Sequence, residues 1–247
     1  MKSCHLLQLL GATLAALSPA QADILSLSLG EIFGNNPIAP SPSGPWLVAT
    51  IEDSVNSSVV LNSNTVRITL DATNLGSNVG SQNKFISAWH VNLNPAFNPS
   101  NFSFTSVLNP TGAALDIDKG LNAYKADGDG FFDFRFNFPT PNSMDRFVTG
   151  EKLIVDVTHT GSLRVNDFLY LSVDKNGNSY SGPTGPFYMA AHVQGTNTDP
   201  GESTSAWIGT KDQGIIAIPE PSASATLIGV AAAMSVALIR RRRTVSI

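Results

Sequence analysis

Cysteine is almost absent from this 247-residue sequence, in which Cys4 is the only one. A single cysteine excludes an intrachain disulfide and the paired-cysteine motifs of structural zinc sites. We also expect Cys4 to be lost with the leader described below, so that the exported chain has no thiol. Such a chain must be stabilised by its core alone, or by its core together with bound ions.

Charged residues are also scarce, at 14% of the chain, against about 25% in average soluble proteins. Asn, Ser, Thr and Gly occupy the polar positions instead, which is common in extracellular β-proteins. The net charge is −4, but the body (residues 23–218) has 10 basic and 18 acidic residues, a net of −8. An acidic body argues against nucleic acid as a partner and is compatible with cation binding.

Catalytic motifs are missing as well. The sequence has no G-x-S-x-G element and no H-E-x-x-H element, and His90, His159 and His192 are widely spaced. We therefore predict that the protein is not an enzyme. A polysaccharide hydrolase is an alternative, which requires two carboxylates about 5–10 Å apart across a cleft.

The first 22 residues have the features of a secretory signal peptide. Lys2 is followed by the apolar run LLQLLGATLAAL, which is too short to cross a membrane comfortably. Ala20 and Ala22 then form the A-x-A pattern that signal peptidase accepts, which predicts cleavage between Ala22 and Asp23. The protein is therefore expected to be exported.

The C-terminal residues 222–247 are predicted to form a transmembrane helix with a basic tail. Ser222–Ile239 is uncharged, and as a helix it would extend about 27 Å, close to the thickness of the hydrocarbon core. The arginines after it would remain cytoplasmic by the positive-inside rule. A Pro-Glu-Pro triplet precedes the apolar segment, and proline keeps such a segment extended and accessible.

This order of elements resembles the PEP-CTERM sorting signal of bacterial exosortase substrates. The resemblance covers about the last thirty residues and implies that an exosortase removes the tail near the triplet after a transient stay in the inner membrane. The body would then reach the cell surface or the extracellular matrix. The matching residues are Pro219, Glu220, Pro221, Arg240, Arg241, Arg242 and Arg243.

The body is predicted to be all-β, an antiparallel β-sandwich or jelly-roll-like single domain over residues 23–211, followed by a linker at 212–221. Short runs with alternating apolar and polar residues are separated by Gly, Pro, Asn and Ser, as in such folds. Residues 116–126 are interpreted as holding a turn of helix. The predicted strands are 24–32, 46–53, 59–75, 85–93, 102–108, 131–138, 152–160, 168–173, 186–193 and 205–210.

The run FFDFRFNF predicts an aromatic core strand. Phe132, Phe134, Phe136 and Phe138 are two residues apart and should share one buried face. The three tryptophans, Trp46, Trp89 and Trp207, are interpreted as core or half-buried residues rather than sugar platforms, and His90 and His192 as hydrogen-bonded sheet histidines.

The stretch ADGDGFFDF is the best candidate for a metal site. Asp127, Asp129 and Asp133 are carboxylates in a glycine-rich loop, and Ca²⁺ prefers oxygen ligands. The third ligand and the final Glu of an EF-hand are missing, and a solvated turn is the alternative. A second stretch, DKNGNSYSG (174–182), is interpreted as a turn because Asn-Gly is a strong turn signal.

Together these features predict an exported, non-enzymatic surface or matrix protein, structural or adhesive in an exopolysaccharide matrix. Its processing partners would be signal peptidase and exosortase, its membrane contact would be transient, and extracellular polysaccharide is a further candidate partner. Besides the hydrolase, a calcium-dependent carbohydrate-binding module is an alternative. It would require the loop at 127–133 to converge on one point beside an exposed aromatic ring.

Overall fold

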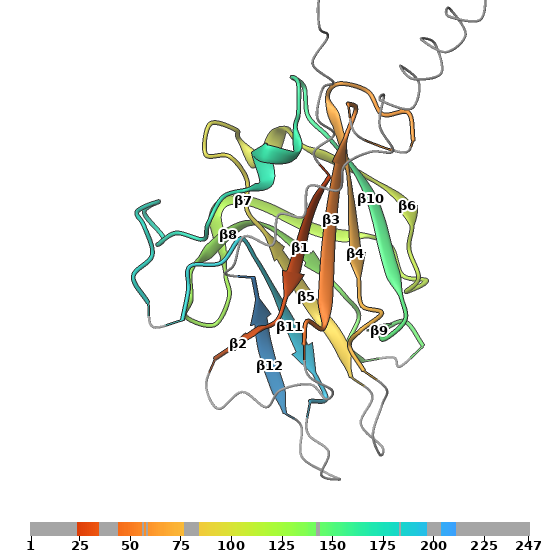
Figure 1. Ribbon diagram of the computed structural model, residues 1–247, viewed down its shortest axis with the longest axis vertical. Coiled ribbons are helices and arrows are strands. Elements are labelled where there is room, and N and C mark those ends of the chain that lie inside the picture. The colour runs from red at the N-terminus through yellow and green to blue at the C-terminus, as the bar shows by residue number, and fades with distance from the viewer. Residues whose placement is uncertain are drawn as a thin grey trace, which may run out of the picture. The chain divides into compact units, whose positions relative to one another are not determined.

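Twelve β-strands and two short 3-10 helices form the regular structure of the described part of the chain (Figure 1). The structure is a computed structural model, and the residues that it describes are 24–34, 44–55, 57, 59–76, 84–141, 144–182, 184–196 and 204–210. The strands form two antiparallel sheets, so the prediction of an all-β sandwich is confirmed.

The first sheet has five strands. In spatial order they are β1 (Leu25–Leu29), β3 (Leu47–Asp53), β4 (Thr65–Asp71), β10 (Lys152–Thr158) and β6 (Ser103–Leu108). Buried and half-buried residues alternate along β3, as expected for a strand with one face on the core.

The second sheet has seven strands. Along its main path they are β2 (Glu31–Phe33), β12 (Ser205–Gly209), β11 (Met189–Gln194), β5 (Phe85–Val91), β8 (Phe131–Asn137) and β7 (Asp116–Lys125), and β9 (Phe147–Val148) also pairs with β5. The two 3-10 helices, η1 (Pro99–Asn101) and η2 (Val165–Phe168), lie in connecting segments.

The main core contains the inward-facing residues of both sheets. Leu27 on β1 and Ile68 on β4 belong to the same buried cluster as Trp89 on β5 and Phe136 on β8. Trp46 and Trp89 are 4% and 0% exposed, and Trp207 is half-buried, so the interpretation of the tryptophans as core or half-buried residues is confirmed.

A second, smaller hydrophobic cluster contains one of the four phenylalanines that were predicted to share one face. Phe134, Phe136 and Phe138 are in the main core, but Phe132 packs with Phe33, Phe187, Ala126 and Ala190 instead. The physical reason is an irregularity in the pairing of β7 with β8, in which residues 120–123 face the single residue Asp133. The alternation of side chains breaks there, so the expectation that all four phenylalanines share one face is wrong.

Two further expectations are corrected. Residues 116–126 contain no turn of helix, because Asp116–Lys125 is the ten-residue strand β7. Residues 168–173 are not a strand. Phe168 ends η2, and Val173 makes only isolated bridges to Phe131 and Ser179.

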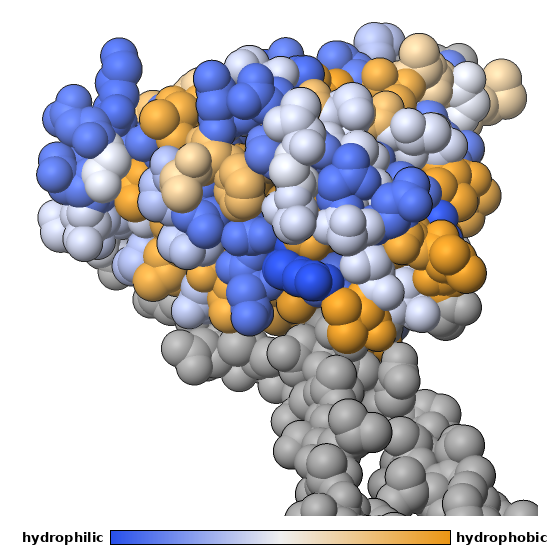
Figure 2. Space-filling model, turned by 90° about the horizontal axis from the view of Figure 1, so that it is seen from above, coloured by the Kyte–Doolittle hydropathy of each residue, from blue (hydrophilic) through white to orange (hydrophobic). Residues whose placement is uncertain are grey.

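Hydrophobic side chains on the face drawn in Figure 2 lie in several separate patches between hydrophilic ones. The large apolar residues that are exposed come from many different segments. They are Val55, Val59, Val60, Val107, Leu108, Leu121, Met144, Tyr170 and Leu171.

Both ends of the chain lie outside the described residues, and with them the predicted signal peptide, its cleavage position, the sorting motif and the predicted transmembrane helix. Among the residues that are described, none belongs to a helix with the length and apolar character needed to cross a membrane.

Candidate functional site

Three aromatic rings lie in a row on the outer face of the second sheet. Strand pairing places Phe33 of β2 opposite Trp207 of β12, and Trp207 opposite His192 of β11. The Trp207 ring is stacked at 6.1 Å from the Phe33 ring and at 4.8 Å from the His192 ring, measured between centroids. The faces of the indole are therefore occupied largely by its two neighbours.

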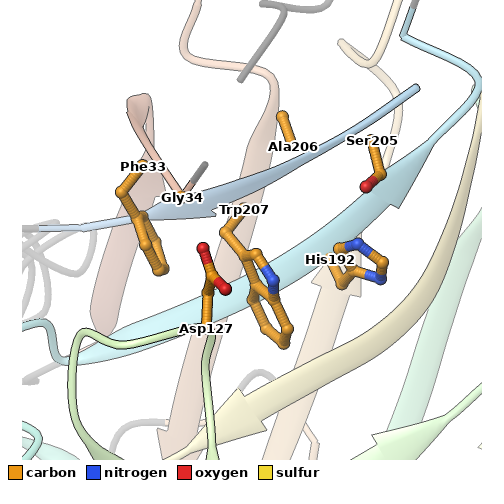
Figure 3. A pocket seen from close by; sticks show the side chains of 7 residues that line it. All are labelled: Phe33, Gly34, Asp127, His192, Ser205, Ala206 and Trp207. Atoms are coloured by element: carbon orange, nitrogen blue, oxygen red, sulfur yellow. The ribbon is translucent and has the colours of Figure 1, made fainter. Parts of the chain in front are cut away.

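A pocket of about 260 Å³ opens beside these rings (Figure 3). We call it the Trp207 pocket, and its lining residues are Phe33, Gly34, Asp127, His192, Ser205, Ala206 and Trp207. The side chain of Asp127 points toward the ring row from the loop that joins β7 to β8 (Figure 3).

Local backbone conformation brings the Asp127 carboxylate to the pocket. Asp127 has a φ of +48°, a left-handed conformation that is uncommon outside glycine. Gly34, at the end of β2, has a φ of +110°, and a Cβ atom there would lie 2.6 Å from Oδ2 of Asp127. Only glycine at position 34 thus allows this close approach of the carboxylate.

Ser87 holds the His192 ring on the adjacent strand. Its Oγ lies 2.8 Å from Nδ1 of His192, and the hydroxyl also reaches the backbone carbonyl of His192 at 3.3 Å. Burial lowers the pKa of His192, and the nearby Asp127 opposes this in part. His192 is therefore a neutral imidazole at neutral pH.

His90 supports the indole from within the sheet. It is 2% exposed, and its ring meets the Trp207 ring edge-on at 5.1 Å and the Phe132 ring at 5.5 Å. Burial lowers the pKa of His90 to about 3, and Arg135 adds to the lowering. Both histidines lie on strands, as predicted, although Nδ1 of His90 has no hydrogen-bond partner among the described residues.

The three carboxylates of the predicted calcium site do not come together. Asp127 faces the Trp207 pocket, whereas Asp129 is buried and accepts a hydrogen bond from the Tyr180 hydroxyl at 3.4 Å. Both oxygens of Asp133 accept backbone N–H groups, from Asn122 at 2.8 Å and from Leu93 at 2.9 Å.

Within the described residues no three acidic or histidine side chains are grouped so that they could hold a metal ion. Calcium binding by one of these carboxylates stays a prediction. The described residues do not form a centre in which all three carboxylates could hold the same ion. The second stretch is a turn, as predicted, because Oδ1 of Asp174 accepts the backbone N–H groups of Asn176 and Asn178, both at 2.8 Å.

A smaller pocket of about 90 Å³ lies at the β7–β8 irregularity. Its lining includes the buried residues Asn92 and Asp133 and the exposed residues Leu121, Tyr170 and Leu171. Each of the two pockets is lined by one carboxylate among the described residues, Asp127 in one and Asp133 in the other. Within the described residues, neither pocket therefore shows the facing carboxylate pair that glycoside hydrolysis requires.

The sequence singled out Asp127, His192 and Trp207, each for a separate reason, but not as neighbours. Phe33, Gly34, Ser87 and Ser205 were missed. Phe33 and Gly34 follow an alternating run, but nothing in that pattern identifies β12 as the partner strand of β2.

No family model, no curated protein and no solved structure matches this chain.

Proposed function

We propose that this protein is exported, sorted through a PEP-CTERM signal by an exosortase, and retained at the cell surface or in an extracellular polysaccharide matrix, where it acts without catalysis. In this proposal signal peptidase removes residues 1–22. The segment 222–247 anchors the chain in the inner membrane until it is removed near the triplet. The body, a sandwich of jelly-roll-like kind, is the part delivered, in a structural or adhesive role.

The observation that carries the proposal is the order of three elements at the C-terminus. A Pro-Glu-Pro triplet at 219–221, an uncharged segment at 222–239 and four arginines at 240–243 follow one another directly. The apolar segment and the arginines alone would suit any membrane anchor. The triplet just outside the predicted membrane position adds a processing site.

The body is compatible with this role. Its acidic and weakly charged composition suits an exported protein and disfavours nucleic acid. Neither described pocket offers a pair of carboxylates, which supports a non-catalytic role over the hydrolase alternative.

The test is the intact mass of the protein recovered from its native host, fraction by fraction. We expect a chain that starts at Asp23 and ends near Pro219–Pro221, with or without an added glycan, in the surface or matrix fraction. A mass that extends through Ile247 and is found only in the inner membrane would refute sorting.

A matched pair of variants separates the motif from the general effect of losing prolines. Replacing Pro219 and Pro221 with alanine should cause the unprocessed chain to accumulate in the membrane. Replacing Pro40 and Pro42, which have the same spacing in the body, should leave processing unchanged.

A further inference from the structure

We propose that the pocket at the β7–β8 irregularity binds the N-acetyl group of an amino sugar, with Asn92 and Asp133 bonding the amide and exposed residues at the rim contacting the sugar ring. We call this pocket of about 90 Å³ the Asn92 pocket. The proposal gives the matrix role a ligand class, and to that extent it rests on the proposed function.

Asn92 supplies a buried amide without a partner. It directly follows β5 and is 2% exposed, and its Nδ2 has no hydrogen-bond partner among the described residues. A buried donor that is left unpaired costs free energy, and such groups are rare in folded proteins. Asn92 lines the pocket, and a turn of its amide about χ2 makes the N–H groups available to a ligand there. A carbonyl oxygen in the pocket would therefore supply the missing bond.

Asp133 places acceptors in the same pocket. It is 3% exposed, and its two oxygens each accept one backbone N–H group, from Asn122 at 2.8 Å and from Leu93 at 2.9 Å. A carboxylate has about four acceptor positions, so each oxygen can accept a further bond. A ligand with both a carbonyl oxygen and an N–H group would match Asn92 and Asp133 together, and an amide is such a group.

The size of the pocket and its apolar residues select an amide that ends in a methyl group. A volume of about 90 Å³ holds about three waters, so the pocket admits a small substituent and not a whole sugar ring. Leu93, Pro95 and Val173 also line it, and apolar residues favour a methyl group over the terminal NH₂ of a glutamine or asparagine side chain. A peptide-bond amide continues into the chain on both sides, whereas an N-acetyl group ends in a methyl group.

Exposed apolar residues at the rim offer a surface to the sugar ring. Leu121, Tyr170 and Leu171 line the pocket and are 55%, 36% and 40% exposed. Leu121 belongs to the irregular part of β7, and the other two follow η2, so two separate segments bring them together. The C–H groups of a sugar can pack on such side chains while its hydroxyl groups remain in water.

The site is also built in advance. Asn122, within the irregularity, has a φ of +48°, a conformation that is uncommon outside glycine, and its N–H group is held by Asp133. Bulges of this kind are frequent next to functional sites, and strained residues are concentrated there. A site that is fixed before binding needs little further ordering when the ligand enters.

The experiment is a titration of the purified full-length protein, in buffer free of sugar-based detergent, with the methyl glycosides of N-acetylglucosamine and N-acetylgalactosamine. Methyl glucoside and methyl galactoside are the matched controls, because a hydroxyl group replaces the acetamido group in each. N-acetylalanine methylamide is the peptide probe. Saturation-transfer NMR identifies the ligand protons that contact the protein, and isothermal titration calorimetry gives the Kd.

We expect at least one N-acetylated glycoside to bind saturably, with the strongest saturation on its acetyl methyl group, and neither the matched controls nor the peptide probe to bind. Asn92→Leu should weaken that binding about tenfold, because one hydrogen bond contributes about that factor. It should not lower the Tm, because it replaces an unpaired buried amide with an apolar side chain of similar size.

A matched pair of variants tests the rim without touching the buried groups. Leu171→Ser should weaken binding about threefold, through the loss of apolar contact area. Leu108→Ser is the same change at a leucine of β6 in the first sheet, which is 47% exposed, and it should leave binding unchanged.

Five results would overturn the proposal. They are no binding of either N-acetylated glycoside, equal binding of these glycosides and the matched controls, binding of the peptide probe as tight as that of the glycosides, unchanged binding by the Asn92→Leu protein, and equal binding by the Leu171→Ser and Leu108→Ser proteins. Loss of glycoside binding in a chelator would also overturn it, in favour of recognition through calcium. A processed tail without glycoside binding would refute this inference alone, and glycoside binding by a chain whose tail is never removed would refute the sorting proposal alone.

Discussion

Gly130 is a glycine whose replacement should be costly, because its backbone conformation and its close packing both disfavour a side chain. It has a φ of +115°, and a Cβ atom there would collide with the side chain of Ser172. Ser172 is 1% exposed, donates to the carbonyl of Asp129 at 3.1 Å and accepts from the N–H of Phe187 at 3.0 Å. The loop before β8 therefore packs directly on a buried hydrogen-bonded hydroxyl.

Gly130→Ala should lower the free energy of unfolding by about 2 kcal/mol or more, because strain at positive φ adds to a clash with a buried group. Urea denaturation followed by circular dichroism would measure the change. Gly128→Ala is the matched control in the same loop, since nothing lies within 4 Å of a Cβ atom there, and it should stay within about 0.5 kcal/mol of the wild type. Equal effects of the two substitutions would contradict the packing argument.

At the scale of elements, ion pairs link neighbouring strands of the first sheet. Arg67 on β4 lies opposite Asp156 on β10 and bonds both carboxylate oxygens, at 2.7 and 2.9 Å. The hydrogen bond to Asp156 also raises the pKa of Arg67. The two side chains are 19% and 23% exposed, so water screens this pair only in part.

A double-mutant cycle with Arg67→Ala and Asp156→Ala should give a coupling of about 0.5–1 kcal/mol in the free energy of unfolding. The reference pair is Lys152–Asp71 on the same two strands, which has one contact at 2.7 Å and a lysine that is 50% exposed. Its coupling should be smaller, because it is neither bidentate nor as well shielded. A larger coupling for Lys152–Asp71 would contradict this reading.

Alternating residues predicted most strands but failed at elements whose shape depends on a partner. β7 contains one β-branched residue and no buried one, so its extended form depends on its pairing with β8. Apolar and polar residues alternate well over 168–173, but the run overlaps the end of η2 at Phe168. The Asp167 carboxylate accepts the N–H of Arg164 and so caps the start of that helix. The pairing irregularity at Asp133 could not be predicted, because the spacing of two residues between the phenylalanines continues across it.

At the scale of the whole molecule, the Trp207 pocket was beyond sequence reasoning because it depends on the order of strands. β2, near the start of the body, pairs with β12, near its end. Period-two patterns show which face of a strand is buried, but they do not show which strands are neighbours. The chemical types of Asp127 and His192 were evident from the sequence, but their common location beside Trp207 was not.

His90, which is buried, and His192, which is half-buried, should make the stability of the whole protein depend on pH. Burial lowers the pKa of His90 to about 3 and lowers that of His192. In the unfolded chain a histidine has a pKa of about 6.5. Below that pH the unfolded chain binds protons that the folded chain does not, so stability is present above pH 6.5 and is lost as the pH falls toward 3.

We therefore expect the Tm to fall as the pH is lowered from 7 to 4.5. A histidine that is protonated in the unfolded chain and neutral in the folded chain lowers the free energy of unfolding by about 1.4 kcal/mol for each pH unit. The raised pKa of Asp133, caused by burial, acts in the opposite direction, since its folded form gains stability as the pH falls. His90→Gln keeps a side-chain donor but cannot be protonated, so its Tm should depend less steeply on pH. Equal slopes for the variant and the wild type would show that His90 is accessible to protons in the folded state, and hence that the ring row above it is not closed.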